Sequence, residues 1–188
     1  RSAAINIGVL DYVEERIEPG ISTNQIDRWI YDYTVEHGGT PADLNFEGYP
    51  KSVCTSINDV VCHGIPNDTD ILHEGDIVNV DCSTILDGYF SDSSRMFCVG
   101  AVSEERKRLC EVTRMSVDAG LAAVKPWQPL SVMAAAVQKT VEDAGFSVVR
   151  EYGGHGIGRE FHEDPFVGFV AGSPDEDALM VPGMCFTI

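Results

Sequence analysis

Two strands joined by a tight turn are encoded in Asp76-Ile-Val-Asn-Val-Asp-Cys-Ser-Thr-Ile-Leu-Asp-Gly-Tyr-Phe-Ser-Asp-Ser-Ser-Arg-Met-Phe-Cys-Val99. Residues 76–86 are rich in β-branched and apolar side chains, which favour a strand, and residues 89–99 run back after them. The dipeptide Asp87-Gly88 between the two runs is the strongest short-range signal for a two-residue hairpin turn. The stretch therefore predicts an antiparallel pair of strands.

The hairpin carries two acidic residues, Asp81 and Asp92, one on each strand. With a two-residue turn, Ser83 faces Asp92 and Ser94 faces Asp81. Both aspartates should then project from one face of the sheet as diagonal neighbours, about 7–8 Å apart. Two divalent cations about 3.5–4 Å apart would fit between such carboxylates and remove their repulsion. The alternative is a pair of solvent-facing aspartates, but the apolar run around Asp81 indicates burial and favours a metal site.

The composition is that of a globular protein with one core or two half-domains: 188 residues, 44% hydrophobic and 23% charged. The formal net charge of −17 argues against a nucleic-acid or anionic-membrane partner, so we expect neither DNA nor a membrane to be bound. The six cysteines form no CxxC motif, which predicts a reducing, cytoplasmic environment without a disulfide framework. The sequence shows neither a signal-peptide pattern nor an apolar run long enough for a membrane helix.

Both ends of the chain resemble the interior of a larger protein. The first residues, Arg1-Ser-Ala-Ala-Ile5, read as part of a helix, and the last, Met184-Cys-Phe-Thr-Ile188, read as part of a strand. We therefore expect a fragment that is truncated at both ends.

A weak internal repeat is present at an offset of 107 residues. Each copy predicts a helix, a proline stop, a second helix, a glycine stop and a strand. The matched pairs are Ile17 with Val124, Pro19 with Pro126, Ile26 with Met133, Ile30 with Val137, and Gly38 with Gly145. A chance alignment of two amphipathic helices is the alternative, but the matching proline and glycine stops favour a two-fold duplication.

The predicted helices lie beside mostly antiparallel strands. Ser22-x-x-Gln25 is a capping box that should begin one helix, and Ser103 should begin another. Strands are expected at 52–57, 76–86, 89–99, 146–152, near 166–170, and at 183–188. This order predicts an α+β fold in a single domain, 1–188, with halves at roughly 1–100 and 101–188.

Three of the five histidines lie in unusual surroundings. His155 lies in Gly153-Gly-His-Gly-Ile-Gly158, which is no dinucleotide-binding loop because the residues after it have no helical stripe and end at Pro165. Glycines without Cβ atoms would instead let the backbone bring the imidazole close to a crowded centre. An imidazole that joins two carboxylates suits divalent Mn, Fe, Co or Zn. The alternative, an ordinary loop histidine, is disfavoured by the presence of Asp81 and Asp92.

His63 and His162 are candidates for catalysis. Each could hydrogen-bond a scissile carbonyl or move a proton, and the alternative for each is a hydrogen-bonded structural histidine. His37, beside Gly38, and His73, beside a turn, receive no role.

Six motifs together resemble the type 1 methionine aminopeptidases over nearly the whole chain. They are Tyr49-Pro-Lys-Ser-Val-Cys-Thr-Ser-Ile-Asn58, Val60-Val-Cys-His-Gly-Ile-Pro66, Gly75-Asp-Ile-Val-Asn-Val-Asp81, Asp87-Gly-Tyr-Phe-Ser-Asp92, Gly154-His-Gly-Ile-Gly158 and Pro182-Gly-Met-Cys-Phe-Thr-Ile188. The resemblance implies the pita-bread fold, a pseudo-two-fold antiparallel sheet covered by helices. It also implies removal of N-terminal methionine from peptides and nascent proteins by a metal-bound hydroxide on two divalent ions.

The resemblance assigns roles to the residues singled out above. Asp81 corresponds to a bridging metal ligand, and Asp92 and His155 correspond to further ligands. His63 resembles the histidine that contacts the amino end of the substrate, and His162 resembles the one that steadies the scissile amide.

The resemblance also places a methionine pocket and a second cation. The pocket would be lined by aromatic rings and a sulfur, which suit a thioether, at Phe46, Tyr49, Cys54 and Phe161. The backbone around Asn58 and Val60 corresponds to a monovalent-cation site. A monomer that meets nascent chains at the ribosome is the expected cellular setting.

The chain departs from the family pattern at several places. Asp43 and Glu47 stand near the pocket where relatives more often have cysteine and histidine, and Trp127 replaces a glycine. The family's two glutamate ligands should follow Ile188, so we expect the 188-residue fragment to have low activity. The alternatives are a pita-bread binding protein without catalysis and a proline-specific peptidase. The intact set of aspartates and histidines argues against the first, and the Tyr49–Asn58 motif argues against the second.

Overall fold

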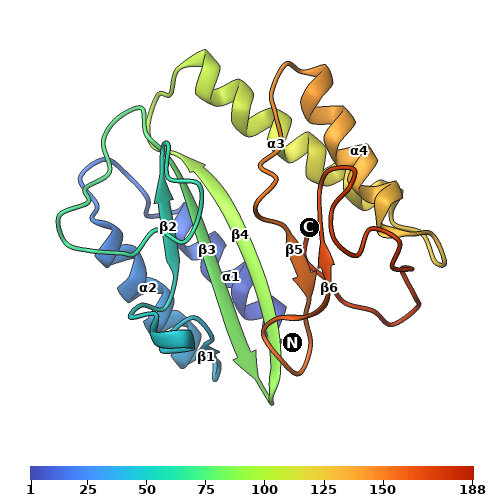
Figure 1. Cartoon of the computed structure of the whole chain (residues 1–188). Coiled ribbons are helices and arrows are strands. Elements are labelled where there is room, and N and C mark those ends of the chain that lie inside the picture. The colour runs from blue at the N-terminus through green and yellow to red at the C-terminus, as the bar shows by residue number, and fades with distance from the viewer. The chain divides into compact units, whose positions relative to one another are not determined.

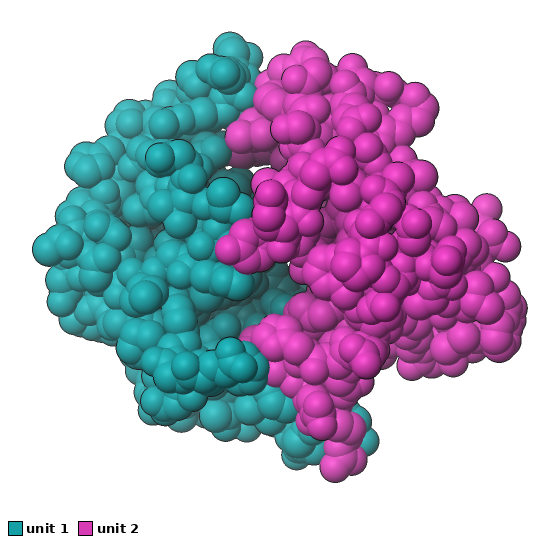
Figure 2. Space-filling model, in the orientation of Figure 1, with its two compact units in different colours: residues 1–106 teal, residues 107–188 magenta.

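The computed structural model describes residues 1–188 as two compact units, Arg1–Arg106 and Lys107–Ile188. Figure 2 shows the two units in different colours. That they form one domain stays a prediction, and each unit is described by itself below.

The first unit contains two helices and an antiparallel sheet (Figure 1). In chain order, its elements are α1 (Ser2–Glu14), α2 (Thr23–Glu36), β1 (Thr40–Pro41), the short 3₁₀ helix η1 (Phe46–Gly48), β2 (Cys54–Ile57), β3 (Ile77–Leu86) and β4 (Tyr89–Cys98). Strand β3 is central, because β1 and β2 pair with it along one edge and β4 pairs along the other. All these pairings are antiparallel, as the hairpin signal predicts.

The core of the first unit lies between the two helices and one face of the sheet. Val78, Val80 and Cys82 of β3 are almost fully buried there, together with Val13 of α1 and Ile30 of α2. Because strand side chains alternate, Asp81 and Ser83 must project from the opposite face of β3. Burial of each of these aliphatic side chains stabilises the fold by about 1.5–3 kcal/mol. This packing therefore determines which face of β3 turns toward the helices and which face carries Asp81.

Helix α2 begins and ends as its sequence predicts. The Ser22 hydroxyl accepts a hydrogen bond from the Gln25 backbone N–H at 3.1 Å, which caps the first turn. The helix ends at His37, and Gly38 follows with a φ of 81°, in the left-handed region that favours glycine.

The second unit contains most of α3 (Glu104–Ala123), α4 (Leu130–Asp143), β5 (Gly154–Gly156) and β6 (Glu163–Val167). Its core gathers Leu130, Met133 and Val137 from α4 around Val167 and Met180. No helix of the chain is both long and apolar enough to cross a membrane.

The repeat is visible in the secondary structure. A shift of α2 by 107 residues gives 130–143, which are the observed bounds of α4. Gly38 and Gly145, which follow the two helices, have φ angles of 81° and 84°.

Two predicted strands are absent, so those predictions are wrong. Residues 146–152 form no strand, because no neighbouring segment pairs with their backbone. Residues 183–188 contribute only an isolated bridge, Gly156 with Phe186. The strand expected near 166–170 begins earlier, as β6, and the one expected at 52–57 is β2.

Candidate metal and peptide site

Strands β3 and β4 pair in the predicted register. Asp81 faces Ser94 and Ser83 faces Asp92, so the two aspartates lie on the same face of the hairpin. Both lie on the face opposite the helices. The arginine of the hairpin, Arg95, points the other way and forms ion pairs with Asp11 and Glu14 of α1.

A third carboxylate, Asp43, joins this pair. Its Oδ2 accepts a hydrogen bond at 3.1 Å from the backbone N–H of Ser83, the residue that faces Asp92. Burial, followed by repulsion from Asp92, raises the pKa of Asp43 to about 7. Burial also raises the pKa of Asp81 well above its usual range, and the charges of Asp92 and Asp43 add to this effect. Asp43 therefore adds a third carboxylate within electrostatic reach of the pair.

The predicted pocket residues Tyr49 and Cys54 lie beside these carboxylates. Cys54 on β2 is the direct partner of Asp81 on β3. Burial raises the pKa of Cys54 to about 12, so its thiol is neutral and behaves as a small apolar group. The Tyr49 hydroxyl lies 3.0 Å from the carbonyl oxygens of both Val53 and Gly64, and burial raises its pKa as well.

The loop that carries His63 is fastened to β2. The Thr55 N–H donates to the Gly64 carbonyl at 2.8 Å, and the Gly64 N–H donates to the Ser56 hydroxyl at 3.2 Å. A Cβ atom on Gly64 would lie 2.1 Å from the Thr55 carbonyl oxygen, so only glycine permits this approach. His63 itself has a φ of 55°. Phe46, in η1, is 36% exposed.

In the second unit, His155 occupies the middle of β5 between two glycines. A Cβ atom on Gly154 would lie 2.1 Å from the Thr187 carbonyl oxygen, and one on Gly156 would lie 2.4 Å from the Asp164 carbonyl oxygen. The glycines therefore permit a close approach of neighbouring backbone to β5.

The His155 ring is held by a backbone carbonyl and by neighbouring rings. Its Nδ1 lies 2.8 Å from the Gly156 carbonyl oxygen, which selects the tautomer that donates from Nδ1. The ring centroid of His162 lies 4.4 Å from that of His155, edge to face. His162 also stacks on the buried Phe161 ring at 4.5 Å.

The structure thus collects the predicted residues in two groups. Asp81, Asp92, Tyr49 and Cys54 lie together in the first unit, and His155, Phe161 and His162 lie together in the second. Within either unit alone, no three His, Cys, Asp or Glu side chains are arranged to hold a metal ion. The ligand set Asp81, Asp92 and His155 therefore stays a prediction.

Asp43 is the residue that sequence reasoning undervalued. From the sequence, Asp43 is notable only as a departure from the family pattern. In the structure, its carboxylate lies within electrostatic reach of Asp81 and Asp92. It lies in an irregular segment between β1 and η1, where no periodicity predicts the direction of a side chain.

The chain belongs to metallopeptidase family M24, whose sequence model it matches over residues 1–188. Members of such a family work with divalent metal ions. The α+β architecture is the pita-bread fold.

Particular relatives agree with this assignment. The chain is 50% identical to methionine aminopeptidase of Escherichia coli strain K12 over 181 residues, which are 96% of this chain and 68% of that protein. The crystal structure of methionine aminopeptidase from Rickettsia prowazekii matches with a TM-score of 0.93 at 42% identity, over 98% of this chain and 73% of that one. The enzyme from Thermotoga maritima matches with a TM-score of 0.92 at 33% identity, over 97% of this chain and 73% of that one.

Proposed function

We propose that this protein is a metal-dependent aminopeptidase that removes the N-terminal methionine from peptides and nascent proteins. The observation that carries the proposal is the aspartate pair on one face of the β3–β4 hairpin, in a chain 50% identical to a methionine aminopeptidase. The arginine of the hairpin, Arg95, forms its ion pairs with α1 on the other face of the sheet.

Asp81, Asp92 and His155 are the proposed ligands of two divalent ions. A buried carboxylate whose pKa is raised by like charges is stabilised when a cation replaces its proton. With the proton on Nδ1, Nε2 is the ring nitrogen of His155 that would coordinate a metal ion. This mixed N/O set suits Mn, Fe, Co or Zn. Such ions, when bound, lower the pKa of a water molecule and polarise a peptide carbonyl.

The two other histidines are proposed to act on the substrate directly. His162, fixed by its stack on Phe161, would donate a hydrogen bond to the scissile carbonyl oxygen. His63, on the loop fastened to β2, would contact the substrate amino group and move a proton.

Phe46, Tyr49, Cys54 and Phe161 are proposed to form the methionine pocket. Aromatic faces and a neutral thiol give a soft, polarisable surface that suits a thioether. Steric limits on the following residue would favour small side chains in the second position.

A monovalent cation is proposed near the backbone of Asn58 and Val60. The Asn58 side chain is held there by Asp76, to which it donates at 2.8 Å, and it accepts from the Ile77 N–H at 3.2 Å. A cytoplasmic, monomeric enzyme that meets its substrates at the ribosome is the setting that we propose.

The test is peptide turnover with and without metal. The full-length protein should hydrolyse Met-Ala-Ser in the presence of Co or Mn and should leave it intact after chelation, whereas Leu-Ala-Ser should be a poor substrate. Asp81→Asn should lose turnover, and the matched control Asp87→Asn, in the exposed turn, should keep it. Equal turnover of the two peptides would contradict the pocket, and activity in Asp81→Asn would contradict the ligand assignment.

A further inference from the structure

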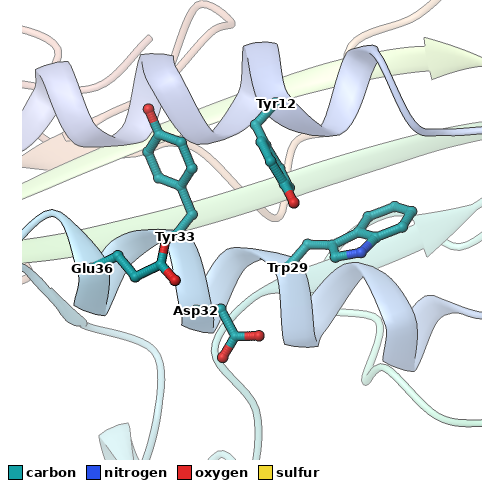
Figure 3. Close-up of a pocket in the computed structure, with 5 residues that line it drawn as sticks. All are labelled: Tyr12, Trp29, Asp32, Tyr33 and Glu36. Atoms are coloured by element: carbon teal, nitrogen blue, oxygen red, sulfur yellow. The ribbon is translucent and has the colours of Figure 1, made fainter.

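A second pocket lies on the helical side of the first unit, on the opposite face of the sheet from Asp81 and Asp92. It has a volume of about 140 Å³ and opens between α1 and α2. Figure 3 shows its lining: Tyr12 from α1, and Trp29, Asp32, Tyr33 and Glu36 from α2. The four α2 residues recur at helical spacing, so they share one face of the helix.

Aromatic rings form the walls of this pocket. Trp29 and Tyr33 pack against the core, so their orientation is fixed. The rings of Tyr12 and Tyr33 lie 5.5 Å apart. The molecule already places a cation on this surface, because the Arg16 guanidinium carbon lies 3.5 Å from the centroid of the Tyr12 ring.

Two carboxylates, Asp32 and Glu36, lie at the pocket one helical turn apart. Both are exposed, and neither forms an ion pair or a side-chain hydrogen bond within the chain. Like charges at this spacing destabilise a helix. Neighbouring arginines do not compensate them, since Arg28 pairs with Asp68 and Arg16 pairs with Glu15. The pocket therefore combines three aromatic rings with a local excess of negative charge.

We propose that this pocket binds a guanidinium or ammonium head group, as in the side chain of arginine or lysine. The Trp29 ring would receive the face of the cation, since Arg16 lies over Tyr12 and His37 stacks on Tyr33, and Asp32 and Glu36 would accept its N–H hydrogen bonds. The volume suits a head group, because pockets for drug-sized ligands occupy about 300–1,000 Å³. A quaternary ammonium ion lacks N–H donors and is a poorer ligand.

Trp29 provides the readout. Replacement of the exposed Trp127 by Phe leaves Trp29 as the single tryptophan of the chain. Titration with N-acetyl-arginine amide should give a saturable change in its fluorescence. The neutral isostere N-acetyl-citrulline amide should give none, and tetramethylammonium should bind more weakly. The same titrations followed by the indole N–H signal in NMR spectra would locate the change at Trp29.

Two double variants distinguish binding in the pocket from a general effect of the protein's net charge. Asp32→Asn with Glu36→Gln should weaken arginine-amide binding by about tenfold or more, as expected for the loss of two charged acceptors. Glu18→Gln with Glu111→Gln removes the same charge elsewhere on the exposed surface and should leave binding unchanged. The proposal is overturned if no saturable change occurs, if citrulline amide binds equally, or if the control variant loses as much affinity.

A further measurement distinguishes a protein side chain from a free small cation as the natural ligand. A neutral peptide with one central arginine should bind more tightly than the free amide if the natural ligand is a protein side chain. Equal affinity would identify a small free cation. Peptidase activity should be unchanged in the Asp32/Glu36 variant, so failure of this proposal is distinguishable from failure of the proposed function.

Discussion

Ionisation of Asp43 lowers the free energy of unfolding of the metal-free protein. Its pKa of about 7 lies above the unfolded value of 3.8, so the folded state retains a proton that the unfolded state has lost between those pH values. Stability should therefore fall as pH rises from about 4 to about 7, by up to about 4 kcal/mol.

Asp43→Asn removes this titration and keeps an acceptor for the Ser83 N–H. With a chelator present, the variant should be more stable than the parent above pH 7, and the difference should vanish near pH 4. Guanidinium unfolding at a series of pH values measures this. Parallel pH profiles for the two proteins would contradict it.

The hairpin shows what sequence can predict at the residue scale. The faces of Asp81 and Asp92 follow from strand alternation and a two-residue turn, both of which are local properties. Asp43 reaches the same carboxylates from an irregular segment, so only the tertiary structure locates it.

Among the elements, β5 depends on its glycines. In Gly154→Ala, the added Cβ would meet the Thr187 carbonyl oxygen at 2.1 Å, and backbone cannot yield as a side chain can. We expect a loss of about 1–3 kcal/mol and displacement of the His155 ring, measured by denaturation and by the imidazole NMR signals.

Gly158→Ala is the matched control for this variant. Its Cβ would meet only the Glu163 carboxylate, with oxygens at 3.2 and 3.3 Å, which accepts from the Arg159 and Glu160 N–H groups and needs to shift by only a few tenths of an ångström. This variant should remain close to the parent in stability. An equal loss in both variants would show that glycine flexibility, rather than close approach, matters in this segment.

The cap of α2 is a second test at this scale. Ser22→Ala removes the acceptor for the Gln25 N–H and should cost about 1 kcal/mol. Ser22→Asp retains an acceptor and should restore most of the stability in thermal denaturation. If both variants unfold at the same temperature as the parent, the capping hydrogen bond contributes nothing to stability.

Helices were predicted better than strands because their signals are local. A cap, an apolar stripe and a glycine stop predict α2, and a glycine stop predicts the end of α4, whereas a strand also needs a partner that lies elsewhere in the sequence. Residues 146–152 contain Phe146, Val148, Val149 and Tyr152, which favour a strand, but they have no such partner, and this is why that strand prediction is wrong.

For the whole molecule, the proposed ligand set draws on β3, β4 and β5. Added Mn or Co should therefore slow amide hydrogen exchange in both 77–98 and 154–156, and Asp81→Asn should abolish both effects. Helix α4 serves as an internal reference and should be unaffected. Protection confined to 77–98 would remove His155 from the ligand set.

The equal bounds of α2 and α4 under the 107-residue shift allow their surfaces to be compared position by position. The core-facing positions are apolar in both helices: Ile26 and Ile30 in α2 correspond to Met133 and Val137 in α4. The solvent-facing positions differ. The counterparts of Asp32 and Glu36 are Lys139 and Asp143, which form an ion pair at 2.6 Å. The surface of α4 therefore carries a neutral pair at these two positions, whereas the surface of α2 carries two carboxylates whose charge a bound cation would balance.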